Sequence, residues 1–208
     1  MQIKVCGITN NRNLRDISLM RPDYMGFIFH GSSPRDVTGT VGLLDLDTIP
    51  PCTRKTAVFV DQPFKKVTDT ITRYRFDAVQ LHGKEDPSFC SDLMNECLVI
   101  KAFGIKESLP ENLEKYMGNC HWFLFDAKGK YPGGNGIKFN HDVLKSYALD
   151  VPFFLSGGIG DQDLPLLAEM AGEGLQGVDV NSRFELSPGY KCASSLKKFI
   201  QKIRTYEL

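Results

Sequence analysis

The chain has 208 residues, of which 42% are hydrophobic and 24% charged, a composition typical of one soluble globular domain with a sizeable core. Its 25 basic and 25 acidic side chains balance, so the net charge gives no sign of a nucleic acid or an anionic membrane as partner. The start, MQIKVCGI, has one lysine and no long apolar segment, and no later stretch reaches the roughly 18 apolar residues that cross a bilayer. We therefore expect a cytoplasmic protein.

Eight short apolar, β-branched runs recur along the chain. Several lack the alternation of a strand with one wet face, and near-continuous hydrophobicity is typical of parallel strands that are covered on both faces. The runs cover residues 3–8, 24–29, 56–60, 76–81, 98–103, 121–126, 151–157 and 175–180. We interpret each of them as one strand.

Helical patterns lie between these runs, with apolar residues three and four positions apart in segments 88–98, 161–172 and 194–208. Alternating strands and helices predict an α/β protein, and eight strands in a chain of this length favour a compact (β/α)8 TIM barrel over an open sheet. We expect one such domain over residues 1–208. The weakest unit is 37–52, which has two glycines and two prolines and predicts a short, irregular helix at best.

The six cysteines are scattered and form no CxxC pair, which argues against a zinc ribbon, a thioredoxin-like motif or a disulfide framework. We interpret most of them as reduced core thiols. They are Cys6, Cys52, Cys90, Cys97, Cys120 and Cys192.

A barrel of this kind carries its functional residues in the loops after the strands. Cys6 ends the first strand and is either a small buried side chain or a base that acts as thiolate. Asp126 closes the run WFLF, where a carboxylate either caps a turn or serves in the cavity at the barrel mouth. Arg35 is either solvated or pairs with a ligand carboxylate. For His30 and His82 we favour hydrogen bonding or packing over metal binding, since no second-ligand spacing supports a metal.

Two loops have the residue types of a phosphate site. GGIG, residues 157–160, follows the seventh strand, and NSRFE, residues 181–185, follows the eighth. In barrels these two loops often bind phosphate through backbone N–H groups, although ordinary turns would have similar sequences. YPGGNG, residues 131–136, matches neither a dinucleotide fingerprint nor a P-loop and is either a lid or a simple connection.

Seven segments, in this order, resemble the phosphoribosylanthranilate isomerase family of tryptophan biosynthesis. The resemblance runs from Lys4 to Lys191, and all but one segment lie at predicted strand ends. The segments are KVCGIT, GFIFHGSSPR, VFVDQ, VQLHG, LFDAK, LSGGI and GVDVNSRFE…PGYK.

The resemblance implies an Amadori rearrangement of N-(5-phosphoribosyl)anthranilate to 1-(2-carboxyphenylamino)-1-deoxyribulose 5-phosphate, without a cofactor or metal. It implies Cys6 as the general base and Asp126 as the general acid, with Arg35 against the anthranilate carboxylate. We add His82 as a substrate-binding residue. The substrate phosphate is expected at Gly157, Gly158, Asn181 and Ser182.

Two departures from the family pattern stand near the last strand: Arg183 replaces a frequent glycine, and Cys192 a common aspartate. We interpret Arg183 as a supplement to phosphate binding. Three alternatives remain: the histidine-pathway isomerase, whose first-strand base is an aspartate; a non-catalytic phosphate-binding barrel; and a thiol-redox role for Cys6. The sequence does not distinguish a monomer from a homodimer.

Overall fold

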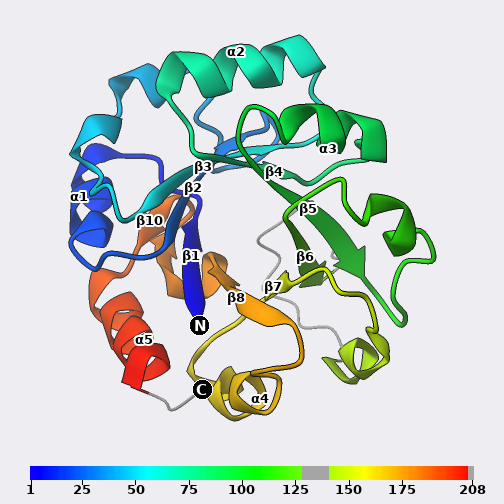
Figure 1. The fold of residues 1–208 in the computed structure, drawn as a ribbon. Helices are drawn as coiled ribbons and strands as arrows, with labels where there is room; N and C mark the ends of the chain where they lie inside the picture. Colours follow the sequence, from blue (N-terminus) through cyan, green and yellow to red (C-terminus); the bar gives the residue numbers. More distant parts are fainter. Residues whose placement is uncertain (128–140, 206–208) are drawn as a thin grey trace.

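The computed structural model describes residues 1–127 and 141–205 of the chain. At its centre is a closed barrel of eight parallel strands in chain order, in which β1 is hydrogen-bonded to both β2 and β8 (Figure 1). The predicted α/β class and eight-stranded barrel are therefore confirmed. The strands are β1 (Gln2–Cys6), β2 (Tyr24–Phe29), β3 (Arg54–Phe59), β4 (Ala78–Leu81), β5 (Leu98–Ile105), β6 (Trp122–Ala127), β7 (Phe153–Leu155) and β8 (Leu175–Val180).

The strands are almost entirely buried because side chains cover both of their faces. Residues two apart on a strand point to the same side, so Leu124 on β6 faces the barrel interior with Asp126. The interior forms its own apolar cluster, and a larger cluster fills the space between the strands and the helices. The members of the interior cluster are Tyr24, Ala78, Ile100, Ala102, Leu124 and Phe154. Double coverage explains the continuous hydrophobicity of the strand sequences.

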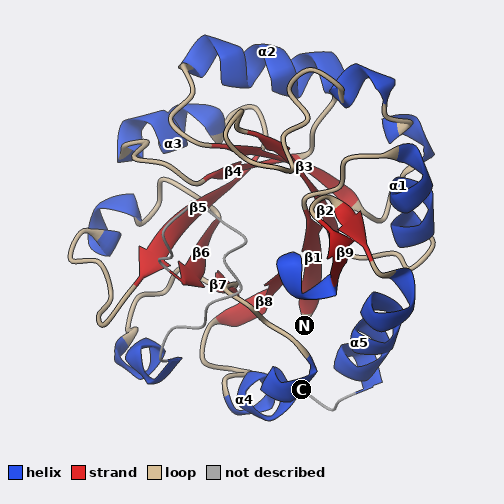
Figure 2. Cartoon of the chain, turned by 180° about the vertical axis from the view of Figure 1, so that it is seen from behind, coloured by secondary structure: helices blue, strands red, loops and turns tan. Residues whose placement is uncertain are grey.

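Among the described residues there are five α-helices. They surround the barrel, as both views of the molecule show (Figures 1 and 2). The predicted segments 88–98, 161–172 and 194–208 overlap α3, α4 and α5, but α3 ends at Leu93 and α4 at Glu169. Residues 161–163 form a 3-10 turn, η5 (Asp161–Asp163), and residues 206–208 lie outside the described residues. None of the helices in the described ranges combines the length and apolar character needed to cross a bilayer. The helices are α1 (Asn11–Ser18), α2 (Phe64–Tyr74), α3 (Pro87–Leu93), α4 (Leu164–Glu169) and α5 (Ala193–Thr205).

The helices α1 and α2 were not predicted from the sequence. Helix α1 begins after Asn10, whose side-chain oxygen accepts a hydrogen bond of 2.9 Å from the backbone N–H of Asn13. Helix α2 buries only Val67 and Ile71 of its 11 residues. Two buried residues are too few to form a clear apolar pattern, so α2 is recognisable only from its packing on the barrel.

Three connections contain 3-10 turns in their described residues. The connection after β2 contains η1 (Val41–Leu43) and η2 (Leu46–Thr48), which confirms the irregular unit predicted over 37–52. The other turns are η3 (Leu113–Tyr116) after β5 and η4 (His141–Ser146) before β7. The predicted lid, residues 131–136, lies outside the described residues.

A short hairpin follows β8 and brings further charged residues to the barrel. The 3-10 turn η6 (Ser182–Phe184) leads into the antiparallel strands β9 (Glu185–Ser187) and β10 (Tyr190–Lys191). The backbone of Lys191 pairs with the buried side chain of Asn13 in α1, at 2.8 and 2.9 Å. This contact fixes the hairpin against α1.

Candidate active site

A small cavity lies at the carboxyl ends of the barrel strands. Four of the residues predicted for catalysis or substrate binding line it from four different strands or the loops after them: Cys6, Arg35, His82 and Asp126. Asn181, predicted for phosphate binding, lines it from the loop after β8. The other lining residues are Ile28, His30, Ser33, Val58, Val60, Gln80, Ser156 and Asp179. The structure thus brings together side chains far apart in the sequence: Asp179 of the lining contacts Lys4 across 175 positions.

Cys6 is the last residue of β1 and is 3% exposed. It lies opposite Gly26 of β2, where an added Cβ would come within 2.7 Å of the Cys6 sulfur. A side chain at position 26 would therefore displace the thiol. Burial raises the pKa of Cys6, as does the carboxylate of Asp179, while the ammonium groups of Lys4 and Lys191 act to lower it.

Asp126 lies near the end of β6 and is 6% exposed. Its Oδ2 is 3.5 Å from Nε2 of His82. The side-chain amide Nε2 of Gln80 lies 3.0 Å from Nδ1 of His82. Gln80 thus contacts His82 through Nδ1, and Nε2 is the ring atom that faces Asp126.

Arg35 does not extend freely into the cavity. It is 7% exposed and forms a two-point ion pair with Glu185 of β9, in which Nη2 lies 2.6 Å from Oε2 and Nε lies 2.9 Å from Oε1. Lys191 Nζ approaches the same carboxylate at 2.6 Å and the side-chain oxygen of Asn181 also at 2.6 Å. The guanidinium has further N–H groups outside its pairing with Glu185, so one edge of it can still meet a second anion.

The predicted phosphate residues lie in the two loops after β7 and β8. Gly157 and Gly158 have φ values of +88° and +75°, the left-handed region that glycine adopts without strain. A Cβ on Gly157 would also come within 2.7 Å of the backbone nitrogen of Ala127. Ser182 and the exposed Arg183 belong to η6. These four residues are outside the lining of the small cavity and follow residues that are part of it, Ser156 and Asn181.

Sequence reasoning missed several charged residues that surround the site. Lys4, Asp179 and Lys191 are all at least nine-tenths buried, and Glu185 is the partner of Arg35. Lys4 and Asp179 could have been found in the sequence, because each is a charged residue inside an apolar strand. Each is also two positions from a residue at the strand end and therefore points to the same side as that residue. No local signal marks Glu185, since its role depends on the fold of the hairpin.

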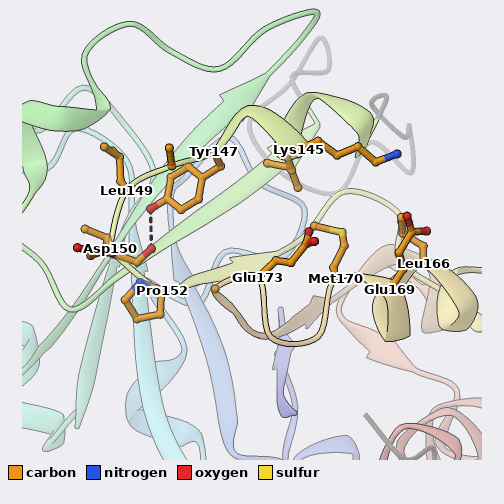
Figure 3. Close-up of a pocket in the computed structure, with 13 residues that line it drawn as sticks. Lys145, Tyr147, Leu149, Asp150, Pro152, Leu166, Glu169, Met170 and Glu173 are labelled. Carbon is orange, nitrogen blue, oxygen red and sulfur yellow. Dashed lines mark hydrogen bonds between the residues drawn. The ribbon is translucent and has the colours of Figure 1, made fainter.

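A larger hollow lies elsewhere. It has a volume of about 780 Å³ and lies between η4, the start of β7 and the end of α4 (Figure 3). Tyr147 hydrogen-bonds to the carbonyl oxygen of Val151 in its wall, at 2.5 Å. Because the residues before β7 and β8 line this hollow, it is at the opposite end of these strands from Cys6 and Asp126. It contains none of the predicted site residues.

The fold and the position of the small cavity define a (β/α)8-barrel protein with its candidate site at the carboxyl ends of the strands. A family model described as N-(5'phosphoribosyl)anthranilate (PRA) isomerase matches residues 3–202. The chain belongs to this family, which confirms the resemblance seen in the sequence.

Individual relatives agree with the family model. The chain is 35% identical to N-(5'-phosphoribosyl)anthranilate isomerase of Parabacteroides distasonis, over 98% of this chain and 93% of the relative. It is also 35% identical to the enzyme of Phocaeicola vulgatus, over 98% of both chains. Among solved structures, phosphoribosyl anthranilate isomerase from Thermus thermophilus matches with a TM-score of 0.85 at 24% identity, over 99% of both chains.

A second similar solved structure is that of a complex with a ligand. It is a phosphoribosyl anthranilate isomerase in complex with reduced 1-(o-carboxyphenylamino)-1-deoxyribulose 5-phosphate, with a TM-score of 0.77 and 26% identity over 98% of both chains.

Proposed function

We propose that this chain catalyses the isomerisation of N-(5'-phosphoribosyl)anthranilate to 1-(2-carboxyphenylamino)-1-deoxyribulose 5-phosphate, a step of tryptophan biosynthesis. Membership of the family and the reduced product analogue bound to a relative support the substrate. The observation that carries the proposal is that Cys6 from β1 and Asp126 from β6, two strands that are not neighbours, line one cavity. A thiol and a carboxyl that face one space are a suitable base and acid for proton transfer.

Asp126 is the general acid in this proposal. Its protonated carboxyl gives a proton to the ring oxygen of the ribose, the bond from that oxygen to C1 breaks, and the nitrogen lone pair forms the C1=N bond of a protonated Schiff base. His82, with Nε2 at 3.5 Å from Oδ2, donates toward the carboxylate that this step leaves behind. For this role the proton of His82 must lie on Nε2, an arrangement in which Gln80, 3.0 Å from Nδ1, is the donor to that nitrogen.

Cys6 is the general base. Its thiolate takes the proton from C2, the C2–H electron pair forms a C1=C2 double bond, and the positive nitrogen is neutralised to an enolamine. The enolamine then gains a proton at C1 and loses the one on the C2 hydroxyl, which gives the amino ketone. Every proton that leaves is replaced, so the reaction needs no oxidant or cofactor.

Arg35 and the loops after β7 and β8 bind the two ends of the substrate in this proposal. Glu185 fixes one edge of the Arg35 guanidinium, and the other edge meets the anthranilate carboxylate. The backbone N–H groups at Gly157, Gly158 and Ser182, with the side chain of Asn181, bind the phosphate. Arg183, exposed in η6, adds a positive charge beside it. Binding both ends places C1 and C2 between the acid and the base.

The test is turnover of the substrate, generated in place from anthranilate and phosphoribosyl pyrophosphate by a phosphoribosyltransferase. The purified protein should remove the fluorescence of phosphoribosylanthranilate far faster than its spontaneous decay, and mass spectrometry should find an isomeric, ketone-containing product that borohydride reduces. A folded protein that leaves the decay at the spontaneous rate would rule out the proposed activity.

A further inference from the structure

A lysine is buried inside the barrel directly below Cys6. Lys4 and Cys6 are two positions apart on β1, so both side chains point into the interior. Lys4 is 0% exposed, and its Nζ donates a hydrogen bond of 2.8 Å to Oδ1 of Asp179. Burial alone would lower the pKa of Lys4, but Asp179 and Cys6 raise it overall, so Lys4 remains an ammonium.

Asp179 is held in position by its own neighbours. It lies opposite Lys4 in the register of β8 and β1, and Ser156 Oγ donates to its Oδ2 at 3.3 Å. Asp179 also lines the small cavity together with Cys6. A buried ion pair is a weak source of stability, because removing two charges from water costs about as much as their attraction returns. The presence of this pair below a candidate base therefore indicates a functional role.

Cys6 can act as a base only in its thiolate form, and the surroundings of the sulfur oppose that form. Burial is the largest influence on the pKa of Cys6, and it favours the neutral thiol. The ammonium of Lys4 is the next largest and favours the thiolate, by its charge and by hydrogen bonding to the sulfur. Its effect exceeds the opposing effect of the Asp179 carboxylate.

We propose that Lys4 is a positioning residue for the reaction: its ammonium stabilises the thiolate form of Cys6, and Asp179 holds that ammonium below the sulfur. This inference rests on the proposed role of Cys6 as base.

Other charged groups face Cys6 from elements packed around β1. Lys191 of β10 favours the thiolate more weakly than Lys4 and is engaged by Glu185 at 2.6 Å. Arg35, from the loop after β2, is engaged by the same carboxylate. Glu185 thus offsets the charge of both cations.

Across the cavity are Asp126 of β6 and His82 and His30 from the loops after β4 and β2. These three groups stay unchanged in the variants below. Differences between variants therefore report Lys4 and Asp179 alone.

The test follows the Cβ signal of Cys6 by NMR in protein labelled with [β-13C]cysteine, assigned by its loss in Cys6→Ser. The pH at which the thiol becomes thiolate is compared among wild type, Lys4→Met and Asp179→Asn. We expect Lys4→Met to raise this pH by at least one unit. Asp179→Asn should lower it, because the amide still accepts from Lys4 but no longer carries a negative charge.

The two opposite shifts separate this role from a purely structural one, which would change melting temperature and leave the titration of Cys6 in place. If Lys4→Met does not fold because Asp179 is left unpaired, the double variant Lys4→Met/Asp179→Asn removes both charges. Asp179→Asn alone still tests the direction of the shift in the Cys6 titration. A Cys6 titration at the same pH in every variant, or a wild-type sulfur that stays thiol at every pH where the protein is folded, would overturn the proposal. The NMR titration needs no turnover, so its outcome is independent of whether the chain is the proposed isomerase.

Discussion

Arg35 and Glu185 are joined by a two-point ion pair across 150 positions of sequence, with Nη2 of the guanidinium 2.6 Å from Oε2 of the carboxylate. The two side chains are 8% and 5% exposed. Because Glu185 also accepts from Lys191 at 2.6 Å, one carboxylate orients two cations beside the candidate active site. The position of Arg35 is therefore set by the hairpin after β8.

Removing the charge of Glu185 should destabilise the fold and weaken substrate binding together. Glu185→Gln leaves two buried cations without their partner, a change that costs about 3–5 kcal/mol in comparable buried pairs. We expect a lower free energy of unfolding in urea and a KM for phosphoribosylanthranilate raised about tenfold or more, since Arg35 is no longer oriented. The exposed pair of Arg15 with Asp45 is the control: Asp45→Asn should change the free energy of unfolding by less than about 1 kcal/mol.

The same carboxylate should make stability depend on pH in the acid range. Burial alone would raise the pKa of Glu185, but hydrogen bonds from Arg35 and Lys191 and their charges lower it overall. A lowered pKa means that its contribution is complete above the unfolded pKa of about 4.3 and is lost as the pH falls through the folded pKa. The melting temperatures of wild type and Glu185→Gln should therefore differ at pH 7 and converge at the acid end. A constant difference down to pH 3 would contradict this expectation.

Gly26 should be required for the reaction because its missing side chain makes room for the Cys6 sulfur. In Gly26→Ala the new Cβ would lie 2.7 Å from that sulfur, so the thiol must move away from the substrate. We expect a fall in kcat of about 100-fold and a loss of stability of roughly 1–3 kcal/mol. Gly39→Ala is the matched control, since nothing lies within 4 Å of the added atom. Equal kcat values in the two variants would show that the placement of the Cys6 sulfur against Gly26 does not affect catalysis.

Another buried ion pair should stabilise the loop that carries His82 and the loop after β3. Lys101 Nζ lies 2.9 Å from Oε2 of Glu85, and Glu85 accepts from the backbone N–H groups of Asp61 and Gly83 at 2.9 and 3.0 Å. Glu85→Gln should lower the free energy of unfolding by about 3–5 kcal/mol.

The exposed pair of Lys65 with Asp69 on α2 offers the contrast, with side chains 84% and 62% exposed. Asp69→Asn should change the free energy of unfolding by less than about 0.5 kcal/mol. If urea unfolding gives the same small change for Glu85→Gln, the loop attachment contributes little to stability.

The sequence predicted the barrel well because its parallel strands are covered on both sides and therefore read as continuous apolar runs. It predicted that Cys6 and Asp126 lie at the same end of the barrel, because strand ends in such a barrel converge at one face. Their roles as base and acid came from the family resemblance and stay a prediction. Helix α2 was missed, since only Val67 and Ile71 are buried on it. The partners Glu185 and Lys191 were missed as well, because the hairpin that places them is held by contacts with α1, such as Lys191 with Asn13, that no local pattern encodes.

The most direct measurement compares kcat for phosphoribosylanthranilate in Cys6→Ser and Asp126→Asn with kcat in the exposed controls Cys52→Ser and Asp47→Asn. Binding of reduced 1-(o-carboxyphenylamino)-1-deoxyribulose 5-phosphate by calorimetry shows whether each variant keeps its site. We expect kcat to fall about 100-fold or more in the first two variants, with the analogue still bound, and to stay near wild type in the controls. Cys6→Ser or Asp126→Asn protein that binds the analogue and turns over substrate at the wild-type rate would contradict the assignment of base and acid.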